Sequence, residues 1–93
     1  MKTTCFEIWA LGYDREGACT NLERYLGEYA TSQYAIQEAE KLQTLEDVVS
    51  PEFALQLRSR GEYVTIQVQE TAVCDDPEDG TECIDVIFEA DLY

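Results

Sequence analysis

The sequence predicts a single-domain α+β fold of order ββα(α)ββ, in which an antiparallel sheet of about four strands carries one main helix packed on one face. Three observations predict this class. Residues 3–13 alternate as a strand does, residues 30–45 show a helical period, and two further alternating segments flank an acidic loop at residues 74–83. A chain of 93 residues suffices for one hydrophobic core, so residues 1–93 are expected to form one small acidic domain.

Residues 3–13 predict the first strand. Phe6, Ile8 and Ala10 fall on one face, and Cys5, Trp9, Leu11 and Tyr13 fall on the other. A strand that is apolar on both faces is expected to be well covered. The segment Asp14-Arg15-Glu16-Gly17 suits a turn that ends on a left-handed glycine, and a second strand is expected over roughly residues 22–29.

Two segments carry helix signals. In residues 30–45 the apolar positions Ala35, Ile36, Ala39 and Leu42 form one stripe. Thr31 or Ser32 is expected to cap the N-terminus of this main helix. Residues 51–60 permit two interpretations, because Pro51 and Gly61 are typical of helix ends while alternating apolar residues are typical of a strand. We favour the helix, since four terminus signals agree: Ser50 as N-cap, Pro51 at the first helical position, Glu52 in the first turn, and Gly61 after two Arg residues.

The last third of the chain predicts a β-hairpin. Val64, Ile66 and Val68 alternate with Thr65, Gln67 and Gln69, and Ile84, Val86, Phe88 and Ala90 alternate with Asp85, Ile87 and Glu89. Such alternation predicts two paired strands with one apolar face and one polar face. The predicted solvent face of the last strand carries Asp85, Ile87, Glu89 and Asp91.

The charge of the chain is strongly negative, with 20 acidic residues, 6 basic residues and no His, for a net charge of -14. Residues 62–93 contain ten of the acids and no Lys or Arg. Direct binding to nucleic acid or to an anionic membrane is disfavoured by this field, whereas a basic protein surface is attracted. No apolar segment approaches a signal sequence or a membrane helix, so we expect a cytoplasmic protein with reduced thiols.

The acidic loop does not match a metal site. Three of its residues coincide with positions of a calcium-binding loop: Asp75, Asp79 and Gly80. Pro77 and Val86 stand where that loop needs oxygen ligands, so the match fails. Without His, the four cysteines do not make a zinc pattern either. Whether Cys74 and Cys83, which flank the loop, form a disulfide stays open.

No reaction is indicated by the sequence. It lacks His, a nucleophile motif and a Gly-rich phosphate loop, and no cofactor or catalytic residue is expected. Aromatic residues offer either core packing or interface anchors. Tyr25, Tyr29 and Tyr34 are expected to cluster near the start of the main helix, with Trp9 and Tyr13 on the second face of the first strand.

We therefore expect a non-enzymatic, acidic protein-binding module that occupies a basic, normally nucleic-acid-binding surface of a partner protein. In size and charge the chain is similar to acidic DNA-mimic proteins of phages and mobile elements, including anti-restriction and anti-CRISPR inhibitors, although it shares no motif with them. The expected contact residues are Asp75, Asp76, Glu78, Asp79, Glu82, Asp85, Glu89 and Asp91. The alternative is a structural domain that self-associates through a sheet edge, its acidity serving solubility; a homodimer is compatible with the sequence.

Overall fold

The computed structural model describes the backbone of residues 3–73 and 81–93 and confirms the α+β class and the element order. Within these residues, four strands, two helices and one 3₁₀ turn follow one another. They are β1 (Thr3–Tyr13), β2 (Cys19–Tyr29), α1 (Ser32–Glu40), η1 (Leu45–Asp47), α2 (Pro51–Arg60), β3 (Tyr63–Val73) and β4 (Thr81–Leu92).

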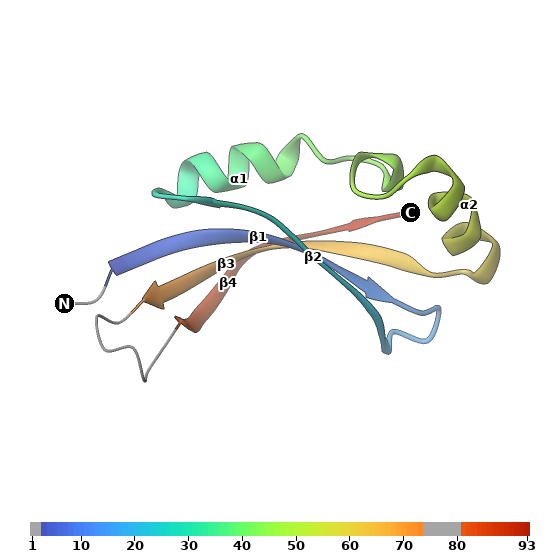
Figure 1. Cartoon of the computed structure of the whole chain (residues 1–93), viewed down its shortest axis with the longest axis horizontal. Coiled ribbons are helices and arrows are strands. Elements are labelled where there is room, and N and C mark those ends of the chain that lie inside the picture. The colour runs from blue at the N-terminus through green and yellow to red at the C-terminus, as the bar shows by residue number, and fades with distance from the viewer. Residues whose placement is uncertain (1–2, 74–80) are drawn as a thin grey trace.

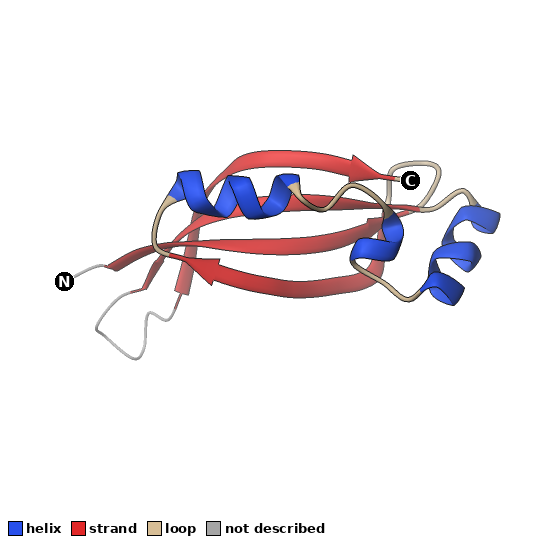
Figure 2. Ribbon diagram, turned by 90° about the horizontal axis from the view of Figure 1, so that it is seen from above, coloured by secondary structure: helices blue, strands red, loops and turns tan. Residues whose placement is uncertain are grey.

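The four strands form one antiparallel sheet in the order β2-β1-β3-β4. The two central strands are therefore β1 and β3, which pair along their whole length from Thr3↔Val73 to Tyr13↔Tyr63. Between β2 and β3 the chain leaves the sheet, forms both helices and η1, and returns to the centre. All three helical elements lie on the same side of the sheet (Figure 1), with α1 running along the strands when seen from above (Figure 2).

The hydrophobic core lies between this side of the sheet, here called the covered face, and the helical elements. The strands contribute four buried side chains to this core: Ile8, Val64, Ile66 and Val68. The η1 turn contributes Leu45. Burial of one such side chain stabilises the fold by about 1.5 to 3 kcal/mol. The covered face thus matches the predicted apolar positions of β1 and β3, and the helices pack on one face of the sheet, as predicted.

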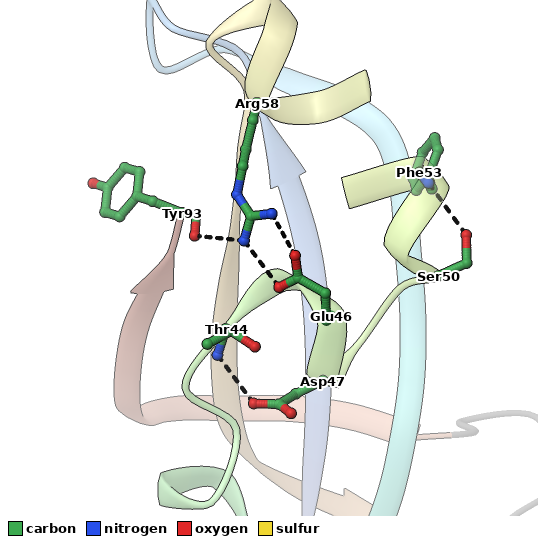
Figure 3. A network of polar contacts seen from close by, with 7 residues as sticks. All are labelled: Thr44, Glu46, Asp47, Ser50, Phe53, Arg58 and Tyr93. Atoms are coloured by element: carbon green, nitrogen blue, oxygen red, sulfur yellow. Dashed lines mark hydrogen bonds and ion pairs between the residues drawn. The ribbon is translucent and has the colours of Figure 1, made fainter. Parts of the chain in front are cut away.

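Both helices begin where the sequence signals place them. The Thr31 hydroxyl accepts a hydrogen bond of 3.3 Å from the Tyr34 amide at the start of α1. At the start of α2 the Ser50 hydroxyl accepts one of 3.2 Å from the Phe53 amide (Figure 3). The second helix ends at Gly61, whose φ of 74° is the left-handed conformation that favours glycine. Residues 51–60 are therefore helical, and the strand interpretation is wrong.

A polar network ties η1 to α2 and to the end of the chain (Figure 3). Both terminal nitrogens of Arg58 donate to the Glu46 carboxylate, the Nη2–Oε2 distance being 2.9 Å. The same Nη2 donates to the backbone carbonyl oxygen of Tyr93 at 3.3 Å. The hydrogen bonds from Arg58, helped by a backbone hydrogen bond, hold the pKa of Glu46 well below its usual 4.5, at about 2. Arg58 thus connects three segments that are distant in sequence.

Candidate functional site: the open face of the sheet

The second face of the sheet, called the open face below, points away from α1, η1 and α2 (Figure 1). No described element packs on it. Because residues directly opposite each other in neighbouring strands point to the same face, the register identifies its members. Trp9 pairs with Tyr25 of β2 and with Gln67 of β3, and Gln67 pairs with Glu89 of β4. One row of the open face therefore crosses all four strands.

Every charged side chain that the register places on the open face is acidic. The two edge strands and β1 contribute five carboxylates to it: Glu7, Glu23, Glu28, Glu89 and Asp91. All but Glu7 are exposed to solvent. The one basic residue within the described strands, Arg24, pairs with Ala10 and belongs to the covered face. The open face is consequently a surface of uniform negative charge.

Two of these carboxylates are held in place by uncharged donors. Thr65 Oγ1 donates to Asp91 Oδ1 at 2.7 Å, and Gln67 Nε2 donates to Glu89 Oε2 at 2.7 Å. Gln69 Nε2 donates in turn to Gln67 Oε1 at 3.0 Å. The donors Thr65 and Gln67 are only 5% and 9% exposed. Hydrogen bonds to ionised acceptors are stronger than neutral ones, so this ladder fixes the outward charges of β4.

Aromatic rings lie among the carboxylates in two groups. The first, which we call the tyrosine row, joins Tyr13 to Tyr63 at 5.7 Å between ring centroids and Tyr63 to Tyr93 at 5.3 Å. The second is the pair of Trp9 and Tyr25, whose rings meet edge to face at 5.4 Å. Tyr93 is 70% exposed and Tyr25 is 50% exposed. Both groups therefore present ring surface to solvent.

The surroundings of these tyrosines keep their hydroxyl groups protonated. Partial loss of solvation raises the pKa of Tyr25, and the carboxylates of Glu28 and Glu7 raise it further. The pKa of Tyr93 is raised by partial loss of solvation and by Asp91. In each case an anionic phenolate would lose solvation and face a like charge. Both tyrosine hydroxyl groups are therefore protonated at neutral pH.

The side chain of Trp9 has an unused hydrogen-bond donor. Its indole Nε1 is shielded from solvent and finds no acceptor among the described residues. An unsatisfied buried donor is costly, and each case needs a physical explanation. Its position on the open face makes it a useful spectroscopic reporter, since Trp9 is the single Trp of the sequence.

The alternation predicted for the last strand is wrong in part. The register shifts between Val68 and Gln69, so that Phe88 pairs with Val68, Val86 pairs with Gln69, and Ile87 has no direct partner. This bulge changes which face the preceding residues occupy. Ile87 packs against the core instead of facing solvent, and Val86 is 39% exposed on the open face.

The same bulge separates the predicted contact residues that can be placed. Glu89 and Asp91 lie on the predicted outward face, which is the open face. Asp85 pairs with Glu70 and therefore lies on the covered face. Glu82 belongs to β4, but its side chain is outside the described residues. Four further predicted contacts, all in the acidic loop, also lie outside them: Asp75, Asp76, Glu78 and Asp79.

The cysteine predictions have different outcomes. Cys74 and the side chain of Cys83 lie outside the described residues, so their pairing stays an open prediction. Cys5 and Cys19 are free thiols. Cys5 is buried, and its Sγ lies 2.9 Å from Thr71 Oγ1. Among the described residues there is no group of three or more potential metal-ligating side chains.

Sequence reasoning missed the contribution of the first hairpin to the acidic surface. Glu7, Glu23 and Glu28 join the open face because β1 pairs with both β2 and β3. The available signal was Glu7, which has the same strand parity as Trp9. Tyr25 was expected to cluster with two other tyrosines near the main helix, and this is wrong. Tyr29 and Tyr34 do pair there at 5.3 Å, while Tyr25 lies on the other side of the sheet.

Other surfaces have less defined chemistry. A cavity of about 310 Å³ lies between the start of β2 and α2, with apolar walls that include Leu22, Phe53 and Leu57. Its polar residues include Arg60 and Glu62, which form an ion pair at 3.5 Å.

None of the described helices is both long enough and apolar enough to cross a membrane. Comparisons of the chain with protein-family models, curated proteins and solved structures find no match.

Proposed function

We propose that this protein is a non-enzymatic acidic binding module whose open face occupies a basic surface of a partner protein, one that normally binds nucleic acid. The observation that carries the proposal is the set of five carboxylates that β1 and the two edge strands place on the open face, with no Lys or Arg on the same face of the described sheet. Ordinary surfaces mix the two signs, because a uniform field repels itself and destabilises the fold.

A sheet face offers a regular arrangement of charge. Alternate residues of a strand, such as Glu89 and Asp91, are about 6.8 Å apart on one face. The hydrogen bonds from Gln67 and Thr65 hold both carboxylates before any partner arrives. Negative charges that are fixed and regularly spaced resemble the phosphates of a DNA backbone, and these phosphates are what the Lys and Arg residues of a DNA-binding surface attract. Preorganisation also reduces the entropy lost on binding.

The proposal is tested by capturing proteins from a host lysate at low salt and eluting them with duplex DNA. The variant E23K/E89K reverses one charge on each edge of the open face. The matched control E40K/E52K makes the same change in net charge on exposed residues of α1 and α2. We expect the wild type and the control to retain identified nucleic-acid-binding proteins that DNA elutes, and the open-face variant to lose them.

Equal capture by the two charge variants would overturn the proposal, because binding would then depend on net charge and not on the open face. Elution by salt but not by duplex DNA would also overturn it, since the bound surface would not be one that binds nucleic acid. Circular dichroism of each variant establishes that it is folded before the capture is interpreted.

Self-association is a second candidate because β2 and β4 are the edges of the sheet. Within the described residues neither strand has a partner on its outer side, and unpaired edges are templates for strand addition. Light scattering distinguishes this function. A mass that doubles with rising concentration supports a dimer, and a constant monomer mass contradicts it.

A further inference from the structure

We propose that the open face selects arginine over lysine, with guanidinium groups of the partner stacking on its exposed rings and donating to the adjacent carboxylates. This inference rests on the proposed function and specifies the partner's contact chemistry. Acidity alone attracts any cation. The rings of the tyrosine row and of the Trp9–Tyr25 pair favour a planar cation that can stack on them, and charge alone does not make this distinction.

The exposed end of the tyrosine row combines a ring with a fixed carboxylate. Tyr93 lies beside Tyr63 with an interplanar angle of 32°, and Tyr63 stacks on Tyr13 at 22°. The Tyr93 hydroxyl is 3.5 Å from Asp91 Oδ2, while Thr65 holds the other oxygen of that carboxylate. A planar cation placed on the Tyr93 ring would therefore have an ionised acceptor close to the edge of the ring.

The Trp9–Tyr25 pair repeats this combination on the other half of the sheet. The two rings meet at an interplanar angle of 64°, so the half-exposed Tyr25 leaves ring surface open to a ligand. Glu7 and Glu28 pair directly across β1 and β2 and lie close enough to Tyr25 to raise the pKa of its hydroxyl. Here too, an exposed ring lies next to carboxylates. In the described strands, no Lys or Arg is placed on the open face by the strand pairing.

Arginine fits this arrangement better than lysine for physical reasons. The guanidinium is planar and weakly hydrated, so it stacks on a ring while its five N–H donors point outward in the plane towards carboxylates. The lysine ammonium is compact and strongly hydrated, and it contacts a ring only as a point charge. A cation on an exposed ring contributes about 0.5 to 1 kcal/mol, which is roughly a two- to fivefold change in affinity for each contact.

The test compares deca-arginine and deca-lysine peptides by calorimetry at one salt concentration. We expect the wild type to bind deca-arginine roughly fivefold more tightly. The variant Y25L/Y93L removes both exposed rings and is expected to lose that preference, while Y25F/Y93F keeps it. The matched control is Y34L, because Tyr34 is 53% exposed but lies on α1. It is expected to bind both peptides as the wild type does.

Equal affinity of the wild type for the two peptides overturns the inference, and so does a preference that survives in Y25L/Y93L. The charge variants distinguish this failure from failure of the proposed function. If E23K/E89K binds both peptides more weakly by the same factor and the wild type shows no preference, the proposed function is supported and the arginine inference is wrong. If E23K/E89K and E40K/E52K bind both peptides alike, the proposed function fails as well.

Discussion

Gln67 Nε2 donates a hydrogen bond of 2.7 Å to Glu89 Oε2 across the two strands of the last hairpin. The donor is 9% exposed, and the acceptor is an exposed carboxylate at the edge of the sheet. A nearly buried amide thus determines where a surface charge lies. The neighbouring bond from Thr65 to Asp91 does the same one step further along β4.

Loss of this amide is expected to cost stability. Replacing Gln67 by Met keeps the length of the side chain but removes the donor, so we expect the free energy of unfolding to fall by about 1 kcal/mol. Urea denaturation measures the change. Gln56→Met on the exposed surface of α2 is the control and is expected to stay within about 0.5 kcal/mol of the wild type. Equal stability of the two variants would show that the bond contributes nothing.

The short η1 turn is expected to matter through one side chain. Leu45 is completely buried, so Leu45→Ala removes apolar contacts and leaves a cavity, at a cost of about 2 to 5 kcal/mol. The same substitution at Leu55, which is 66% exposed on α2, should have little effect. Thermal denaturation of both variants tests this, and a similar loss at the two positions would contradict the described core.

The ion pair of Glu46 and Arg58 predicts a specific pH dependence. The folded pKa of Glu46 is about 2, below its ordinary 4.5. Stability from this lowered pKa is fully present above pH 4.5 and is lost as the pH falls from 4.5 towards about 2. The difference in unfolding free energy between the wild type and Glu46→Gln should therefore shrink over that range. Arg58→Met should give the same profile, and a difference that is independent of pH would contradict the pairing.

Gly12 is expected to be intolerant of any side chain. A Cβ at this position would lie 2.8 Å from Leu22 Cβ and closer still to Thr20 Oγ1, at the point where the β1–β2 register shifts between Leu11 and Tyr13. Gly12→Ala should cost about 2 kcal/mol through this clash. Gly17→Ala meets no atom within 4 Å and is strained only by its φ of 85°, for a smaller cost of about 1 kcal/mol. Chemical denaturation should rank the two in this order, and the reverse order would be inconsistent with the close approach of β2 to Gly12.

Local signals predicted the parts of the fold that depend on neighbouring residues. The geometry of a helix end favours particular residues, and α2 has them in Ser50, Pro51 and Gly61. These residues identify α2 although the spacing of its apolar residues is ambiguous. The left-handed glycine of the first turn was predicted correctly for the same reason. Alternation likewise identified the covered face of β3.

The composition of the open face depends on information that is not local. The β4 bulge changes the face of Asp85 without a glycine or proline to mark it. The placement of Glu7 beside Glu28 depends on which strands pair, and single-sequence periodicity does not specify that order. Thr65 and Gln67 are polar residues on the predicted polar face, yet they are buried in the two central positions of rows that β1 and β4 complete on either side.

Binding of a basic partner to the open face of the sheet is tested most directly by titrating deca-arginine into ¹⁵N-labelled protein. The Trp9 indole N–H and the Gln67 side-chain amide report on the open face. The amides of Gln33, Gln37 and Gln56 report on α1 and α2. We predict that the Trp9 and Gln67 signals shift, in proportion to binding, while those of the helices stay in place. Shifts confined to the helix signals, with Trp9 unmoved, would contradict binding at the open face.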